Sequence, residues 1–372
     1  MSVLVWVAVV VGAVALFLLV QFVYLVAVLT WGDEKTRGLG YYGLAPAERV
    51  RFKEKLARHA RLLRPILALF ARTSKFTFER ASFRHQGIAG PRGTCTEASF
   101  ARGAAYVPRP EDVFVATQMK CGTTWMQHLV YQVVMRGHGD IVESGRTLYA
   151  VSPWLEAVKS VPVDEAPVHG EERPTRVIKT HFPVRLCPFD TAARYIYVSR
   201  HPASCFASCA DFIATNAGGA TPPLEVTETW FCSDDMWWGP WTEHVRAWWV
   251  RAQHEQNVLF VRFEDMKRDL PVVARRVAAF LGIAPLSDTE LADVVHKCGF
   301  AYMQEHDDAF EMNPPHLLQT NAELFVRGTA DRHRDVPADM RARIIAWCAA
   351  EMTKGGVPLE EVYPEIAAGK GA

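Results

Sequence analysis

A short apolar run leads directly into a tight turn and then into a helical pattern, and this order narrows the choice of fold sharply. The run covers residues 113–116, the turn covers residues 120–124, and apolar side chains at helical spacing follow from near Trp125 to Arg136. A strand, a turn and a helix N-terminus direct backbone N–H groups and the positive end of a helix dipole at one point. Two adjacent hydroxyls and a lysine add donors for an anion. The sequence therefore predicts a phosphate-binding loop.

Further apolar runs alternate with helical patterns along the rest of the chain. Strands are predicted over residues 176–179, 194–199 and 258–262, and helices over residues 202–214, 240–254, 270–281, 287–298 and 337–352. Pro202 stands at a helix start, where its missing N–H does no harm. Strands and helices that alternate with short connections are typical of an α/β fold with a parallel sheet. The ligand of such a sheet binds at the carboxyl ends of the strands.

The lysine of the phosphate-binding loop precedes the glycine, whereas the standard P-loop reads Gly-x-x-x-x-Gly-Lys-Ser/Thr. This order disfavours a nucleoside-triphosphate kinase, although a kinase built on a variant phosphate loop stays open. Lys120 taken alone also fits a solvated surface lysine. The complete run from Lys120 to Trp125 behind a strand is much more specific than its lysine.

Composition and charge exclude several classes of protein. The 372 residues are 49% hydrophobic and 22% charged, which is typical of a globular chain and excludes a disordered or collagen-like one. Lys and Arg number 41, as do Asp and Glu, so no global basic field favours a nucleic-acid partner. No Cys/His spacing indicates a metal site, and the 8 cysteines are too few for a disulfide scaffold. We expect reduced thiols.

The N-terminal segment has the composition of a membrane anchor. Residues 1–32 carry no charged side chain, and about 20 apolar residues suffice for a helix to cross the hydrocarbon core. A cleaved signal peptide would have a basic beginning and a shorter apolar stretch, so a retained signal anchor is favoured. Residues 33–75 contain 11 Lys and Arg against 4 Asp and Glu, which by the positive-inside rule places the domain in the cytoplasm. A lumenal, Golgi-type orientation is the alternative, weakly disfavoured because the chain has no Asn-x-Ser/Thr sequon.

A basic amphipathic pattern follows the anchor over residues 48–72, with apolar side chains at steps of three and four. Such a helix suits an anionic membrane surface, and a helix docked on the main domain is the alternative. Residues 74–108 are predicted to be an irregular connector. The expected organisation is an anchor over residues 1–32, a juxtamembrane segment and connector over residues 33–104, and the main domain over residues 105–372.

Several blocks, in order, resemble the cytosolic-type sulfotransferases that use 3′-phosphoadenosine 5′-phosphosulfate (PAPS). The resemblance covers roughly residues 105–350, and it rests on Lys120-Cys121-Gly122-Thr123-Thr124-Trp125, on Lys179-Thr180-His181, on Arg200 with Ser208, on Phe263-Glu264-Asp265 and on residues 241–249. It implies a P-loop-like sulfotransferase fold with a parallel sheet. It also implies transfer of the sulfuryl group from PAPS to an acceptor hydroxyl, with 3′-phosphoadenosine 5′-phosphate (PAP) as product.

The resemblance also implies roles for these residues. His181 would be the general base, and Lys120 and Lys179 would neutralise the transferring group, so that no metal is needed. The other histidines, His244 among them, are expected to be surface or packing residues, and residues 230–240 are a candidate border of the acceptor pocket. The nucleotide would be held by Lys120, Cys121, Gly122, Thr123, Thr124, Trp125, Arg200, Ser208, Arg327 and Gly328, with Trp125 on the adenine and Arg200 and Ser208 on the 3′-phosphate.

The sequence departs from the family in several places. Met119-Lys120-Cys121 stands where the family usually has Pro-Lys-Ser, and Val326-Arg327-Gly328 stands where it has Arg-Lys-Gly, so one expected arginine is missing. The family's dimerisation motif is not recognisable, which leaves the oligomeric state open. An N-terminal anchor is unusual for the cytosolic branch.

Cys121 carries a hypothesis of its own. A thiol beside Lys120 and at the first turn of a helix has a lowered pKa, and in a nucleotide pocket it would be open to solvent. Cys121 is therefore a candidate reactive thiolate. The alternative is an inert thiol turned into the packing between strand and helix.

The identity of the acceptor lies beyond the sequence. An anchor followed by a basic surface helix favours an apolar, membrane-partitioned alcohol or phenol, and a carbohydrate or a small metabolite stays open. A catalytically silent, membrane-tethered nucleotide-binding protein is a further alternative. The intact pair of Lys120 and His181 argues against it.

Overall fold

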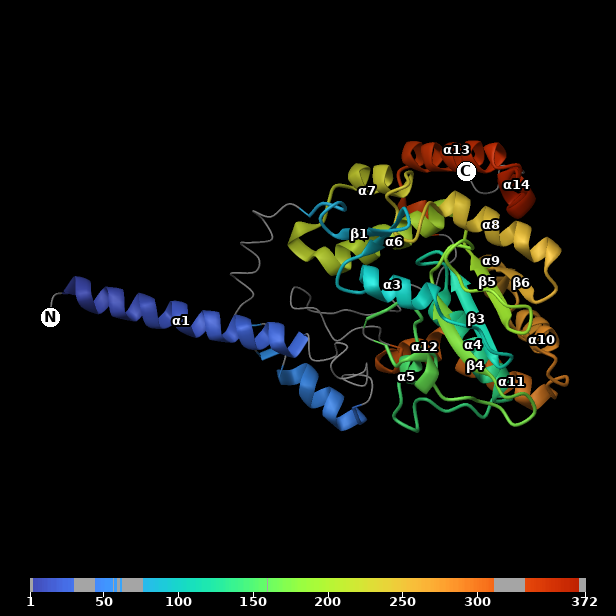
Figure 1. The fold of residues 1–372 in the computed structure, drawn as a ribbon, viewed down its shortest axis with the longest axis horizontal. Coiled ribbons are helices and arrows are strands. Elements are labelled where there is room, and N and C mark those ends of the chain that lie inside the picture. The colour runs from blue at the N-terminus through green and yellow to red at the C-terminus, as the bar shows by residue number, and fades with distance from the viewer. Residues whose placement is uncertain are drawn as a thin grey trace.

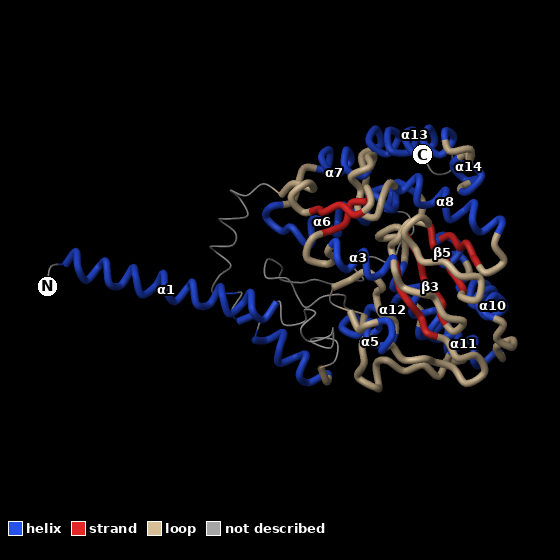
Figure 2. Tube along the Cα trace, in the orientation of Figure 1, coloured by secondary structure: helices blue, strands red, loops and turns tan. Residues whose placement is uncertain are grey.

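A computed structural model of the protein describes residues 3–29, 44–55, 57–58, 61, 76–158, 160–310 and 332–367. Figures 1 and 2 show a long N-terminal helix projecting from a body in which helices surround a sheet. The elements are α1 (Val3–Leu29), β1 (Ser82–His85), β2 (Ile88–Pro91), α3 (Glu97–Ala104), β3 (Asp112–Thr117), α4 (Thr123–Val134), α5 (Leu148–Val151), β4 (Arg176–Thr180), β5 (Arg194–Ser199), α6 (Pro202–Ala217), α7 (Leu224–Phe231), α8 (Trp241–His254), β6 (Val258–Arg262), α9 (Phe263–Arg268), α10 (Leu270–Leu281), α11 (Asp288–Lys297), α12 (Phe300–Glu305), α13 (Ala338–Lys354), α14 (Leu359–Val362) and α15 (Pro364–Ala367).

The central sheet has four strands in the order β4-β3-β5-β6, and each neighbouring pair is parallel. In its register Ala116 lies opposite Thr180, and Thr117 lies opposite Val198. Because all four strands run the same way, their carboxyl ends meet at one edge of the sheet. The predicted α/β class and its four strands are confirmed.

Helices cover both faces of this sheet. Successive side chains of a strand point to opposite faces, and β3 shows both. Val113 and Val115 belong to one apolar core with side chains of α4, α10 and α11, whereas Phe114 and Ala116 belong to the other core with side chains of α6, α8 and α13. The two cores fix the sheet between two helical layers.

Local capping groups set the ends of several helices. The Asp269 side chain accepts a hydrogen bond from the N–H of Val272 at the start of α10, and Gly282 ends that helix with a φ of 72°. α4 begins at Thr123, two residues before the predicted start. The reason is that Gly122 takes the N-cap position in a left-handed conformation.

Residues 76–104 fold onto the main domain, so the prediction of an irregular connector over residues 74–108 is wrong. β1 and β2 form an antiparallel hairpin around Gln86 and Gly87, whose φ values are 48° and 80°, as a tight hairpin turn requires. Phe83 and Phe100 are buried against each other with ring centroids 4.9 Å apart. Strands of four residues are too short to show a periodicity, and burial against distant elements stabilises them instead.

α1 contains a span, Val3–Val23, that is long and apolar enough to cross a membrane and that is not buried against the rest of the protein. The prediction of an apolar N-terminal helix is confirmed. By length and composition alone this span fits an anchor or a signal sequence. Residues 30–43, which begin the basic segment, lie outside the described residues.

The predicted amphipathic helix over residues 48–72 is described only in part, and most of it beyond residue 55 lies outside the described residues. Residues 46–55 are helical. Arg49 is buried, and its Nη1 donates a hydrogen bond to the carbonyl oxygen of Gly145 at 2.9 Å. Phe52 packs against the core that contains Phe114 and Ala116. The start of this helix is therefore docked on the domain, as in the alternative interpretation.

Candidate active site

β3, β4 and β5 end side by side at one edge of the sheet, and each is followed by a predicted site residue. Lys120 follows β3, His181 follows β4 and Arg200 follows β5. The parallel register thus brings these three residues to the same edge, although 80 positions separate Lys120 from Arg200 in the chain. This edge is the expected ligand position in a parallel α/β sheet.

The loop after β3 is a tight left-handed turn that opens α4. Lys120 has a φ of 63° and Gly122 a φ of 99°. The hydroxyl oxygens of Thr117 and Thr123 lie 2.6 Å apart and connect the strand end to the helix start. No side chain caps the N-terminus of α4 within the described part of the chain. The N–H groups of its first turn are therefore available to an anion.

We expect Gly122→Ala to disrupt this loop. An added Cβ would lie 2.7 Å from Cδ2 of Phe263, and a φ of 99° is unfavourable for alanine. The free energy of unfolding should fall by about 1–3 kcal/mol, and nucleotide affinity should fall as well, as denaturant titration and calorimetry would show. Gly93→Ala is the matched control, because Gly93 has a φ of 89° but open space at its Cβ position. A Gly122→Ala protein that binds nucleotide as tightly as the Gly93→Ala protein would contradict this role.

Two lysines provide positive charge at the site. Lys179 is 1% exposed, its Nζ donates to the hydroxyl of Tyr149 at 3.2 Å, and the same Nζ lies 3.4 Å from the ring centroid of Trp154. Burial lowers the pKa of Lys179 to about 7, and the charge of Lys120 contributes. Burial likewise lowers the pKa of Lys120 to about 8, with a contribution from Arg200. An anion bound between these cations would offset both effects.

His181 has the hydrogen bonding of a general base. It is 5% exposed, and its Nδ1 lies 2.9 Å from the carbonyl oxygen of Thr117. A carbonyl oxygen can only accept, so Nδ1 carries the proton and Nε2 carries the lone pair. Burial holds the pKa of His181 well below its ordinary value, with a contribution from the charge of Lys179. The imidazole is therefore neutral near pH 7 and able to accept a proton at Nε2.

Arg200 is held beside the loop that follows β3. Its Nη1 donates to the carbonyl oxygen of Lys120 at 3.2 Å, and its guanidinium lies 4.4 Å from the ring centroid of Phe263. Its Nε is buried and has no hydrogen-bond partner in the part of the chain that the structure describes. Ser208 is buried two turns further along α6. An arginine with an unused buried donor is suited to a phosphate.

Trp125 is fixed at the first turn of α4. Its Nε1 donates to the carbonyl oxygen of Cys298 at 2.8 Å, and its ring meets Phe263 edge-on with centroids 5.5 Å apart. Lys267 Nζ lies 5.3 Å from the centroid of the indole. The indole is thus held in place next to the loop that the sequence predicted to bind phosphate.

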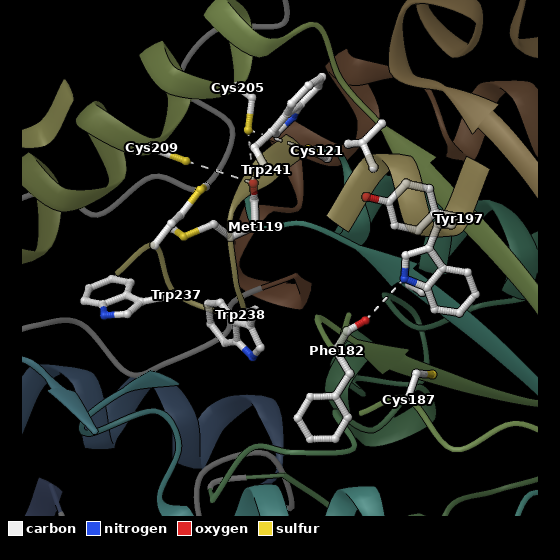
Figure 3. Close-up of a cluster of buried hydrophobic side chains, with 14 of the residues drawn as sticks. Met119, Cys121, Phe182, Cys187, Tyr197, Cys205, Cys209, Trp237, Trp238 and Trp241 are labelled. Carbon is white, nitrogen blue, oxygen red and sulfur yellow. Dashed lines mark hydrogen bonds between the residues drawn. The ribbon is translucent and has the colours of Figure 1, made fainter. Parts of the chain in front are cut away.

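Cys121 does not have the environment of a reactive thiolate, and that hypothesis is wrong. Its side chain is completely buried, with Sγ 3.6 Å from Sγ of Cys205 on α6. Figure 3 shows Cys205 and Cys209 directed at the carbonyl oxygen of Met119, next to Cys121. Burial raises the pKa of Cys121 well above its ordinary value, with a further contribution from the Cys205 thiol. Because the side chain turns into the packing between loop and helix, only the backbone of Cys121 is available to a nucleotide.

We therefore expect Cys121 to resist iodoacetamide in the native protein. Peptide mapping by mass spectrometry should find it unmodified in the folded state and modified after denaturation, which serves as the control for detection. Alkylation of native Cys121 that PAP suppresses would show instead that the thiol faces the nucleotide.

The structure adds several residues to the candidate site that the sequence analysis did not assign to it individually. Trp154 flanks Lys179, and Trp238 lies with its ring centroid 4.7 Å from that of His181. Trp238 lies in the stretch 230–240 that the sequence marked as a candidate acceptor border. His244, predicted to be a surface or packing residue, is buried, and its Nε2 lies 2.9 Å from the carbonyl oxygen of His181. No local motif marks these residues, because each reaches the site from a separate segment.

The predicted C-terminal contacts to the nucleotide cannot be placed. Arg327 and Gly328 lie within residues 311–331, outside the described residues. Arg332, which directly follows that range, forms an ion pair with Asp211 of α6. Its positive charge also contributes to the lowered pKa of Lys120, after burial. Arg332 thereby adds a cation to the site that the sequence analysis did not assign there.

Comparisons with known proteins agree with this geometry. Mouse sulfotransferase 2B1 is 28% identical over 254 residues, which cover 66% of this chain and 72% of that protein. Sulfotransferase 1C2 of Oryctolagus cuniculus is 30% identical over 210 residues, which cover 54% of this chain and 69% of that protein.

Solved structures show the same fold. The crystal structure of mouse sulfotransferase SULT7A1 complexed with PAP is similar with a TM-score of 0.57 at 20% identity, covering 73% of this chain and 94% of that one. The crystal structure of retinol dehydratase in complex with androsterone and PAP is similar with a TM-score of 0.61 at 20% identity, covering 74% of this chain and 92% of that one. The family model described as the sulfotransferase domain matches residues 110–356, well over half of the chain. The chain belongs to the sulfotransferase domain family.

Proposed function

We propose that this protein transfers the sulfuryl group of PAPS to the hydroxyl of a small-molecule acceptor, giving a sulfate ester and PAP. The observation that carries the proposal is the convergence of a neutral imidazole, His181, with the buried Lys179, the partly buried Lys120 and an arginine at one sheet edge. A base and several cations at one sheet edge suit the transfer of an anionic group to a hydroxyl. Membership of the sulfotransferase domain family supports the same reaction.

The residues present fit a doubly phosphorylated nucleotide. Gly122 is the N-cap of α4, and no side chain in the described part of the chain caps the N–H groups of the first turn. The ring of Phe263 packs so closely against Gly122 that a Cβ would not fit there. The Nε of Arg200 is a buried donor with no partner in the described part of the chain. The loop from Lys120 to Trp125 would hold the 5′-phosphate, and Arg200 and Ser208 would hold the 3′-phosphate. Arg327 and Gly328 are proposed to complete that second contact.

The protein's own residues account for the remaining requirements of the reaction. When bound, PAPS supplies an electrophilic sulfur whose leaving group is PAP. Nε2 of His181 accepts the proton of the acceptor hydroxyl, and the hydrogen bond from Nδ1 to Thr117 holds the ring in the required tautomer. Lys120 and Lys179 provide fixed positive charge where negative charge develops. Burial at the sheet edge strengthens these interactions because it excludes water.

We propose an apolar or membrane-partitioned alcohol or phenol as the acceptor. The rings of Trp154 and Trp238 both pack near His181, with centroids 5.1 and 4.7 Å from that of the imidazole and 5.9 Å from each other. A base beside two indoles that are in contact with each other favours an apolar or aromatic molecule. The structural neighbour retinol dehydratase was solved with androsterone and with retinol, and one curated relative is a 3-alpha-hydroxysteroid sulfotransferase of Cavia porcellus, 27% identical over 226 residues.

We also propose that α1 is a retained single-pass anchor and that the catalytic domain faces the cytoplasm. The exposed apolar span Val3–Val23 and the basic excess over residues 33–75 support this orientation. Protease treatment of sealed microsomes should degrade the catalytic domain without detergent. A domain that is protected until detergent is added would favour the lumenal orientation.

The reaction is tested by incubating the detergent-solubilised protein with PAPS labelled at sulfur and a lipid extract, followed by identification of the labelled product. A labelled sulfate ester that forms only with PAPS supports the proposal. Calorimetry with PAPS and with ATP separates it from a kinase, for which ATP would bind more tightly. PAPS binding without any labelled product from lipids, phenols or sugars would favour the catalytically silent protein.

A further inference from the structure

Glu156 is a completely buried carboxylate next to two catalytic residues. Its Oε1 accepts a hydrogen bond from the backbone N–H of His181 at 2.7 Å, and its Oε2 accepts one from the hydroxyl of Thr180 at 3.0 Å. Buried carboxylates are rare because losing hydration costs several kcal/mol. The sequence analysis gave this residue no role.

The segment that carries Glu156 runs along the end of β4. The N–H of Lys179 donates to the carbonyl oxygen of Pro153 at 2.8 Å, and the N–H of Leu155 donates to the carbonyl oxygen of Lys179 at 2.9 Å. Trp154 therefore lies opposite Lys179 in a parallel bridge, with its ring over the ammonium. One short segment thus forms the surroundings of both Lys179 and His181.

We propose that Glu156 is a positioning residue for sulfuryl transfer: its carboxylate fixes the backbone that carries His181, and its negative charge supports the ammonium of Lys179. The proposal rests on the reaction proposed above. Glu156 acts through these two residues, because its hydrogen bonds go to the peptide N–H of His181 and to Thr180.

The first half of the proposal follows from how His181 is held. Its backbone N–H donates to Glu156, its carbonyl oxygen lies 2.9 Å from Nε2 of His244, and its Nδ1 lies 2.9 Å from the carbonyl oxygen of Thr117. His244 is itself fixed, with Nδ1 2.9 Å from the hydroxyl of Tyr197. Three contacts from three segments leave the imidazole little freedom, and a general base misplaced by about 1 Å loses much of its effect.

The second half follows from the charges around Lys179. Burial lowers the pKa of Lys179, Glu156 and the Cys95 thiol act to raise it, and Lys120 acts to lower it. Glu156 is the carboxylate among these groups. Burial raises the pKa of Glu156 itself, and its hydrogen bonds from the N–H of His181 and the hydroxyl of Thr180 oppose that shift by stabilising the charged form. The charge of Glu156 also acts to raise the pKa values of two nearby thiols, Cys95 and Cys187. The charge of Arg102 acts to lower the pKa of Cys95. His181 is faced by Lys179, His244 and Lys120, and none of these is an anion.

The direction of the pH effect can be worked out from this arrangement. If Glu156 loses its charge, Lys179 releases its proton at a lower pH. The activity that depends on the ammonium is then lost earlier as the pH rises. On a plot of activity against pH, this loss is the alkaline limb of the profile. A residue that only stabilised the fold would change the amount of folded enzyme without shifting the pH of the alkaline limb.

The test compares Glu156→Gln, which keeps the shape and removes the charge, with wild type. At pH about 7.5 we expect kcat to fall at least tenfold and the alkaline limb of kcat/KM for PAPS to move down by about one pH unit. PAP affinity measured by calorimetry should stay within about twofold, because Glu156 does not belong to the nucleotide loop. An unmoved limb, or a kcat that falls only in proportion to folded protein, overturns the proposal.

Two further variants separate charge from shape and from burial. Glu156→Asp keeps the charge but withdraws it by one methylene, so kcat should fall while the limb stays at the wild-type pH. Asp112→Asn removes another completely buried carboxylate, which binds Nε of Arg176 at 2.8 Å at the opposite ends of β3 and β4. It should lower stability and leave the limb in place. A shifted limb in Asp112→Asn would show that any buried charge has this effect and would overturn the specific role of Glu156.

A measurement without turnover keeps this inference separate from the reaction itself. An NMR pH titration of protein carrying ¹³C at the lysine Cε atoms, with the Lys179 signal assigned by its loss in Lys179→Arg, reports the pKa of Lys179 in wild type and in Glu156→Gln. A lower value in the variant supports the electrostatic half even if no PAPS-dependent product forms, in which case the proposed reaction fails by itself. Equal pKa values of Lys179 in the two proteins overturn the electrostatic half of the proposal.

Discussion

His181→Ala should reduce turnover by a factor on the order of 100 or more while PAP affinity stays nearly unchanged. The imidazole would remove the proton of the acceptor hydroxyl, and its only hydrogen bonds within the described part of the chain hold it to Thr117. Its loss therefore removes an interaction made in the transition state and leaves the nucleotide contacts intact. Steady-state kinetics with labelled PAPS, together with calorimetry for PAP, measure the two effects separately.

His181→Gln is a useful companion to this variant. Glutamine can donate to the carbonyl oxygen of Thr117, as Nδ1 does in wild type, but it cannot accept a proton near neutral pH. It should be as inactive as the alanine variant, with stability closer to wild type. Near-wild-type turnover in either variant, with any acceptor, would remove His181 from the mechanism.

The pH profile of kcat/KM for PAPS should reflect the same site. Burial holds the pKa of His181 well below its ordinary value, so the base is already neutral and no acid limb is expected near pH 7. On the alkaline side the rate should fall as Lys179, with a pKa of about 7, and then Lys120, with a pKa of about 8, lose their protons. The profile of kcat/KM reports the free enzyme, to which these values apply.

Arg200→Ala should weaken PAP binding by about 2–4 kcal/mol, because it removes a charge-assisted contact to phosphate in a partly desolvated site. The guanidinium is pre-oriented by Phe263 and by the carbonyl oxygen of Lys120, and its buried Nε has no other partner in the described part of the chain. Adenosine 5′-phosphosulfate lacks the 3′-phosphate and should bind the variant and wild type alike. Calorimetry with both ligands gives the comparison.

Arg262→Ala provides the matched control for this second variant. Arg262 ends β6 directly before Phe263, but it is paired with Asp265 and Glu365 at 3.0 and 3.1 Å. Its loss should lower stability without changing PAP affinity. If Arg200→Ala weakens both nucleotides equally, Arg200 supports the structure of the loop and does not select for the 3′-phosphate.

Local sequence was sufficient to predict the tight turn after β3 and most of the sheet. The turn from Lys120 to Thr124 is encoded within a few residues, because a glycine with positive φ and a helix start are local features. The strands ending before His181 and Arg200 were recognisable as apolar runs, and the parallel register brings their ends together. The likeness of these blocks to one family then assigned their roles.

The tertiary structure alone decided how these residues are surrounded. Cys121 looks like a thiolate from its neighbours in the chain, but its side chain packs against Cys205, 84 positions away. Glu156 and Trp154 reach Lys179 and His181 because their segment pairs with the end of β4, and His244 reaches His181 from α8. Side-chain direction, desolvation and pKa depend on contacts between distant segments, and no local spacing encodes them. The positions of the turn and of the strand ends could therefore be predicted from sequence, whereas the burial around them could not.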